Sequence, residues 1–98
     1  MEEARVREYA ERHGKSVERG DMAAVASDLI EDLHPQHPVI GQILPNPCDK
    51  PEILSIKPAD DHAVVHIRYS GPDKTVTIRS RWEERGGTPM IVDAGPVE

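Results

Sequence analysis

The chain has 98 residues, enough for one hydrophobic core and too few for two, so we predict a single domain spanning residues 1–98. There are 18 acidic and 12 basic residues, the net charge is −6, and no stretch concentrates Lys or Arg, which argues against nucleic acid as a partner. With no Phe, one Trp and two Tyr, the core must be built mainly from aliphatic side chains.

The sequence offers neither a membrane-spanning segment nor a disulfide framework. No apolar run approaches the length that crosses a bilayer, and Met1–Arg5 contains no apolar core or cleavage site. Cys48 is the only cysteine, which excludes an intrachain disulfide. We therefore predict a cytoplasmic protein that has no membrane partner.

The first expected element is an amphipathic helix from Glu2 to Arg19. Its apolar positions follow the three-and-four spacing of one helical face: Val6, Tyr9, Ala10, His13 and Val17. Gly20 is well placed as the left-handed residue that ends this helix.

Asp21 is a natural N-cap for a second helix over Met22–Leu33, because its carboxylate can accept from the free amides of the first turn. We expect that helix to end at His34-Pro35, since the residue before a proline avoids helical geometry. The following segment, up to Pro51, is rich in proline and predicts a covering loop or lid with a short turn of helix around Val39–Leu44.

The remaining residues predict an antiparallel meander. Two-residue alternation and turn residues place four strands at Glu52–Lys57, Ala63–Ser70, Thr75–Arg85 and Pro89–Ala94. Pro58 would interrupt a hydrogen-bonded ladder, so the first strand is expected at an edge. The predicted fold class is α+β, with two N-terminal helices packed on a curved antiparallel sheet of about four strands.

Alternation along the strands separates an apolar inner face from a charged outer face. The inner face is expected to hold alternate residues of the two middle strands: Ala63, Val65, Ile67, Tyr69, Val76, Ile78, Ser80 and Trp82. Arg79 and Arg81 then lie on the outer face. The last strand does not divide cleanly, because both of its faces carry apolar residues: Met90, Val92 and Ala94 on one, and Ile91 on the other.

Two segments carry a recognisable pattern. The first holds two helices joined by Gly-Asp, and the second holds a long strand, a turn and a return strand. They read RHGKSVERGDMAAVASDLI, from residue 12 to 30, and TIRSRWEERGGTPMIVDAGPV, from residue 77 to 97. In this pattern the chain resembles the nuclear-transport-factor-2-like superfamily, including its SnoaL-like members with a cystatin-like α+β cone. The resemblance implies a strongly bent sheet that forms a cone-shaped barrel around the helices, an apolar pocket, and homodimers formed through the outer sheet face.

Five inward side chains are candidates for binding a small apolar molecule in such a pocket: Tyr9, His13, Tyr69, Ser80 and Trp82. A few hydrogen-bonding groups in an apolar cavity fix the orientation of a ligand, while the walls bury it. The same residues would equally serve to fill a solid core, and the sequence leaves both interpretations open.

Enzymes of the superfamily, such as ketosteroid isomerase and scytalone dehydratase, transfer protons with an inward carboxylate or a His–Asp pair. The acids of the meander are expected in turns, on the outer face or at the rim: Asp60, Asp61, Asp73, Glu83, Glu84 and Asp93. His13 has no partner that the sequence identifies, so no catalytic residue is assigned. The leading hypothesis is a non-catalytic, cofactor-free domain that binds a small apolar ligand in the helix–sheet pocket, dimerises through its sheet, or does both. The alternative is a small cofactor-independent isomerase, dehydratase or hydrolase that acts on an apolar substrate.

Two further hypotheses concern metal binding and association. His34, His37, Cys48 and Asp49 are suitable zinc ligands, but the prolines between them hold the segment extended, and we predict no metal site. The outer face of the third strand, Thr75–Glu83, carries charges of both signs that would pair across a two-fold axis, which favours a homodimer through this face. A solvated face, or a face that binds a different protein, is the alternative.

Overall fold

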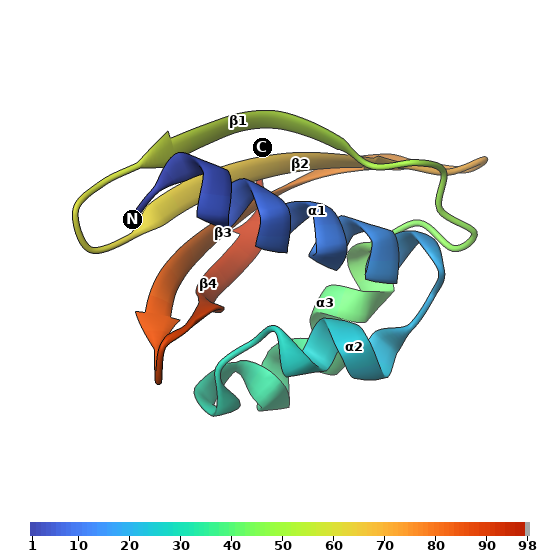
Figure 1. The fold of residues 1–98 in the computed structure, drawn as a ribbon. Helices are drawn as coiled ribbons and strands as arrows, with labels where there is room; N and C mark the ends of the chain where they lie inside the picture. The colour runs from blue at the N-terminus through green and yellow to red at the C-terminus, as the bar shows by residue number, and fades with distance from the viewer. Residues whose placement is uncertain (98) are drawn as a thin grey trace.

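The computed structural model describes residues 1–97, which form three α-helices, one 3-10 helix and a four-stranded antiparallel sheet (Figure 1). In chain order the elements are α1 (Glu3–Glu18), α2 (Met22–Ser27), η1 (Glu31–Gln36), α3 (His37–Ile43), β1 (Glu52–Pro58), β2 (Ala63–Ser70), β3 (Thr75–Arg85) and β4 (Thr88–Pro96). The predicted α+β class is confirmed. The predicted pair of helices is not, because the second is broken into shorter pieces.

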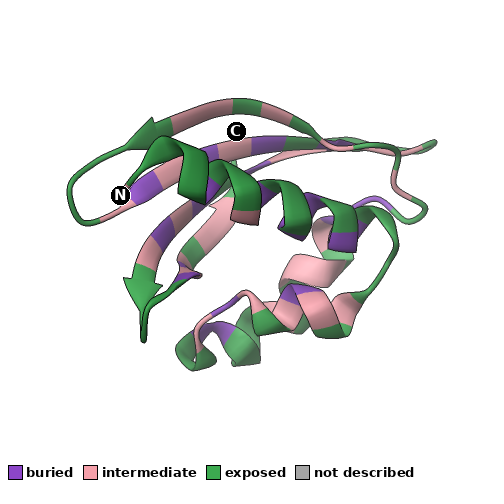
Figure 2. Ribbon diagram, in the orientation of Figure 1, coloured by how far each residue is buried: buried purple, intermediate pink, exposed green. Residues whose placement is uncertain are grey.

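Helix α1 lies along the sheet and packs against β1 and β2 (Figure 1). Its buried residues form one stripe, and its opposite side is exposed (Figure 2): Val6, Ala10, His13, Gly14, Ser16 and Val17 are buried. Gly20 follows the helix with a φ of 70°, so its predicted left-handed conformation is confirmed.

Helix α2 is much shorter than predicted. Asp21 caps it as expected, because its carboxylate Oδ1 accepts a hydrogen bond of 3.1 Å from the N–H of Ala24. The helix nevertheless ends at Ser27, and the prediction that it continues to Leu33 is wrong.

The cause lies in β4, which draws the chain out of the helix. The N–H of Ile91 donates to the carbonyl of Asp28 at 2.8 Å, and the N–H of Ile30 donates to the carbonyl of Ile91 at 3.0 Å. Leu29 thereby forms a short parallel bridge with Ile91. The N–H groups of Asp28 and Leu29 still donate to carbonyls of α2, but the carbonyl of Asp28 and the N–H of Ile30 bond to the sheet instead of continuing the helix.

The prediction that the second helix ends at His34-Pro35 is also wrong, since that helix ends earlier and η1 runs through Pro35 and leads directly into α3. Proline fixes φ near the value of a 3-10 turn and removes one N–H, which a short turn tolerates. Helix α3 overlaps the turn of helix expected at Val39–Leu44. It contains no buried residue (Figure 2), and Val39 is 62% exposed.

The strands pair in the order β1-β2-β3-β4, all antiparallel, so the predicted meander is confirmed, including the edge position of β1. The sheet is open, with β1 and β4 as its edges. Part of the β4 edge is occupied by the bridge to Leu29. The β3–β4 turn is formed by Gly86 and Gly87, whose φ values of 62° and 83° suit the two-residue turns that join twisted strands.

A β-bulge explains why β4 did not divide cleanly into two faces. The register shifts so that Arg81 pairs with Asp93 whereas Trp82 pairs with Ile91, which leaves Val92 without a partner. Ile91 and Ala94 therefore lie opposite inward residues of β3, although their separation along the strand is odd. Strict alternation cannot predict this.

The core joins the inner face of the sheet to α1, α2 and the segments next to α3. Its residues are aliphatic except for Tyr69 and Trp82: Val6, Ala10, Val17, Val25, Leu29, Leu33, Leu44, Ala63, Val65, Ile67, Tyr69, Ile78, Trp82 and Ile91. Trp82 is 0% exposed. The predicted orientation of β3, with the indole inward and the arginines outward, is confirmed.

Candidate functional site

The helix–sheet cavity lies within the core, between the sheet and the helices. Its walls come from every helical segment except η1 and from three strands: His13, Val17, Val25, Leu29, Ile40, Leu44, Ile67, Tyr69, Ile78, Ser80, Ile91 and Ala94. Its volume of about 20 Å³ is enough for one water molecule. The lining is apolar apart from an imidazole, a phenol and a hydroxyl.

The structure thus brings three of the five predicted site residues to one cavity, namely His13, Tyr69 and Ser80. Trp82 is not part of the lining, but it lies directly behind it. Its indole N–H donates to Oγ of Ser80 at 3.0 Å, and its ring meets the ring of His13 edge-on with centroids 6.0 Å apart. Ser80 Oγ in turn donates to the carbonyl of Val65 at 3.4 Å.

Tyr9, the fifth predicted residue, is not brought to the cavity. Its half-buried ring packs beside the core, with the guanidinium groups of Arg5 and Arg12 over it at 5.6 and 5.1 Å from the ring centroid. Such cation–π contacts cover part of the ring that the core leaves exposed.

Asp28 is the site residue that sequence reasoning missed. Its Oδ2 lies 2.8 Å from Nδ1 of His13, and His13 is only 9% exposed. The carbonyl of Asp28 is held by the N–H of Ile91, so β4 positions the carboxylate beside α1. The predicted helix over Met22–Leu33 gave no reason to pair His13 with Asp28. The only signal in the sequence for an earlier helix end is Ser27-Asp28, two residues of modest helix propensity.

The phenol of Tyr69 is 2% exposed, and burial is the main cause that raises its pKa well above the usual value. The group therefore stays protonated at neutral pH and can donate a hydrogen bond to whatever occupies the cavity.

Of the four side chains considered as zinc ligands, two, those of His34 and Cys48, contact backbone carbonyls. Nε2 of His34 lies 3.1 Å from the carbonyl of Ala26 and 3.2 Å from that of Leu29, and the thiol of Cys48 donates to the carbonyl of Asp49. Burial raises the pKa of that thiol, with Asp49 and Glu18 adding to the shift. Among residues 1–97, no three His, Cys, Asp or Glu side chains are grouped so as to hold a metal ion.

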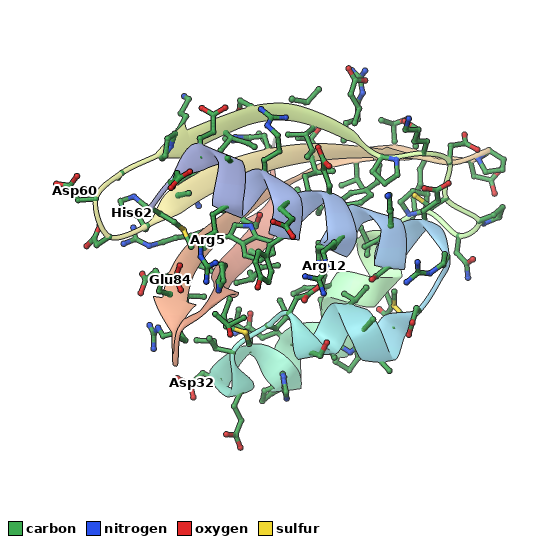
Figure 3. The ribbon with its side chains drawn as sticks, in the orientation of Figure 1. Arg5, Arg12, Asp32, Asp60, His62 and Glu84 are labelled. Atoms are coloured by element: carbon green, nitrogen blue, oxygen red, sulfur yellow. The ribbon has the colours of Figure 1, made fainter. Side chains whose placement is uncertain are left out.

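The outer-face arginines of β3 have acidic partners in the same chain. Arg81 and Arg85 contact the carboxylate of Glu83 at 3.0 and 3.1 Å, and these hydrogen bonds lower its pKa. Arg79 lies 3.8 Å from Asp93 on β4. On the opposite side of the sheet, Arg5 of α1 reaches Glu84 at 2.7 Å (Figure 3), which ties the first turn of the helix to the end of β3.

A scan against protein-family models finds no match to this chain, and neither a search of curated proteins nor a search of solved structures finds one. The resemblance to the nuclear-transport-factor-2-like superfamily therefore stays a prediction. Within residues 1–97, no helix combines the length and apolar character that crossing a membrane requires.

Proposed function

We propose that this chain is a ligand-binding domain of the nuclear-transport-factor-2-like type, with a cone-like sheet, that takes up a small, largely apolar molecule in the helix–sheet cavity. The observation that carries the proposal is the composition of the cavity wall. Apolar side chains surround it, and three hydrogen-bonding groups from different elements, His13, Tyr69 and Ser80, converge on it. This combination supplies burial from the walls and orientation from the polar groups.

Binding requires the cavity to open, because it holds no more than one water molecule in this structure. Helix α3 is the wall suited to move. It has no buried residue, it packs chiefly against η1, and it contributes Ile40 to the lining. Outward movement of α3 would enlarge the cavity without breaking the sheet or the packing of α1.

The test uses cyclohexanol and cyclohexanone, two apolar rings with a single polar group. Each is titrated into the full chain while amide chemical shifts and the midpoint of thermal unfolding are recorded. We expect shifts at Val25, Ile67 and Ile91 and a raised midpoint, since the ligand binds only the folded state.

A matched pair of variants shows whether binding occurs in the cavity. Ala94→Leu adds volume to the wall and should abolish the response, whereas Val64→Leu, on the outer face of β2, should retain it. Absence of binding to the native chain, or equal binding by both variants, would refute the proposal.

A second candidate function is proton-transfer catalysis, which the contact between His13 and Asp28 favours specifically. In the neutral imidazole, a carboxylate that accepts from Nδ1–H selects the tautomer whose Nε2 carries no proton, and in that form the ring can act as a base toward a molecule in the cavity. With cyclohexanone in D₂O, His13 would remove a proton from the carbon beside the carbonyl, and the resulting enolate would take up a deuteron.

Proton NMR measures this exchange directly. We expect His13→Gln to slow it about a hundredfold or more, while His62→Gln, in the β1–β2 turn, leaves it unchanged. Exchange that persists in His13→Gln would exclude catalysis by this residue, and bound ketone that does not exchange would leave the ligand-binding function alone.

We also propose that the chain forms a homodimer through the outer sheet face. Two features support this: the core contains few aromatic residues, and the outer face of β3 carries charges of both signs. A second sheet packed on that face would bury more surface and pair opposite charges. Light scattering of the native chain and of Thr77→Glu, with Glu11→Gln on α1 as control, tests it. A monomer at all concentrations would contradict the proposal.

A further inference from the structure

Two arginines that have no carboxylate partner among residues 1–97 line a cleft between α1 and α2, and one of them, Arg12, also places its guanidinium over the ring of Tyr9. Six arginines lie within 4.0 Å of a carboxylate: Arg5, Arg7, Arg68, Arg79, Arg81 and Arg85. Within residues 1–97, the other two, Arg12 and Arg19, have no such partner, and both line this cleft. The chain has a net charge of −6 and 18 acidic residues, so arginines without a carboxylate partner are unexpected.

The α1–α2 cleft has a volume of about 290 Å³ and is lined by Arg12, Lys15, Ser16, Arg19, Ala24, Ser27 and Asp28. Lys15 adds a third cation that has no acidic partner among the described residues. Figure 3 shows Arg12 on the side of α1 that faces α2. A cleft of this size suits a small ligand rather than a chain segment.

The other lining groups limit what the cleft can bind. Ser16 Oγ donates to the carbonyl of Arg12 and Ser27 Oγ donates to that of Ala24, so both hydroxyls are already used as donors. Asp28 is the one acid in the lining, and its carboxylate is bonded to His13. The lining thus holds three cations and one carboxylate that already has a partner, and this balance favours an anionic ligand.

We propose that the α1–α2 cleft binds a small phosphorylated molecule through its phosphoryl group, held by Arg12, Lys15 and Arg19. Two guanidinium groups match phosphate oxygens in paired hydrogen bonds, and the ammonium adds a point charge. This site differs from the helix–sheet cavity, and the two meet only through Asp28, which lines the cleft and contacts His13 of the cavity wall. Binding of phosphate here does not depend on the ligand proposed for the cavity.

The experiment titrates inorganic phosphate and pyrophosphate into the full chain at constant ionic strength and follows amide chemical shifts. We expect changes confined to the ends of α1 and α2 that face the cleft, with pyrophosphate bound more tightly than phosphate. Arg12→Gln and Arg19→Gln should each weaken pyrophosphate binding about tenfold. Arg19→Lys should weaken it less, because the charge is kept and only the paired geometry is lost.

Arg7→Gln is the matched control, since it removes the same charge from the same helix away from the cleft. Basic residues near the C-terminus of α1 also stabilise the helix end, and that role alone would lower the unfolding midpoint in plain buffer without any effect of pyrophosphate. Three outcomes would overturn the proposal. They are variants that lower the unfolding midpoint but bind pyrophosphate normally, an absence of pyrophosphate-dependent shifts in the native chain, and an equal loss of binding in Arg7→Gln.

Discussion

Nδ1 of His13 lies 2.8 Å from Oδ2 of Asp28, so the buried face of α1 is joined to the C-cap residue of α2. The same Asp28 accepts a backbone bond from Ile91 of β4. Asp28 therefore connects two helices and the sheet edge, and through His13 it reaches the wall of the helix–sheet cavity.

Asp28→Ala should destabilise the protein by about 1–3 kcal/mol, because the imidazole of His13 stays buried after it loses its partner. Chemical denaturation measures the change in the free energy of unfolding. Asp32→Ala removes an exposed acid from η1 and should change it by less than about 0.5 kcal/mol. Equal effects of the two substitutions would show that the His13 contact contributes nothing.

Ser80→Ala should cost about 1–3 kcal/mol, since it leaves the indole N–H of Trp82 unpartnered inside the core. Trp82 is the only tryptophan, so its fluorescence reports both the unfolding transition and the local change. Ser27→Ala, which removes an exposed hydroxyl bonded within α2, serves as control. A fully stable Ser80→Ala protein with unaltered emission would contradict the assigned hydrogen bond.

Gly71→Ala should destabilise the protein by about 1–3 kcal/mol through overpacking. A Cβ atom at residue 71 would lie 2.6 Å from both the Cβ of Pro45 and the carbonyl oxygen of Pro47, and a backbone atom cannot move aside easily. At Gly95 an added Cβ meets nothing within 4 Å, so Gly95→Ala should be close to neutral. Thermal unfolding compares the two variants. If Gly71→Ala does not lower the midpoint, the segment that contains Pro45 and Pro47 must move aside without cost.

Stability should fall as the pH rises above the ordinary pKa of tyrosine. Burial raises the pKa of Tyr69 in the folded state, so above pH 10.0 the unfolded chain loses a proton that the folded chain keeps. The free energy of unfolding then decreases with pH, by about 1.4 kcal/mol per pH unit from this group.

Tyr69→Phe removes that contribution, because the variant has no phenol to titrate at this position. The difference in stability between the native chain and Tyr69→Phe, measured by urea denaturation across this range, should be constant at neutral pH and then shrink as the pH rises. A difference that does not change with pH would mean that the phenol is not held protonated by burial.

The middle of the sheet was predictable because its signals are local. The bounds of β2 and β3 match the alternation in the sequence residue by residue, and the Gly86-Gly87 turn takes the positive φ values that glycine permits. The N-cap at Asp21 was likewise predictable, since capping uses only the next few residues. In each case the residues that determine the structure are neighbours in the chain.

The features that create the candidate site were decided by contacts between distant residues. Val92 is bulged because β3 and β4 shift register, and α2 ends at Ser27 because Asp28 and Ile30 bond to Ile91. Both changes alter which side chains face inward, and neither leaves a periodic signal in the sequence. The sequence by itself therefore determined the strands, their order and the inward indole, while only the tertiary structure paired His13 with Asp28, because backbone groups must find partners wherever the packed chain supplies them.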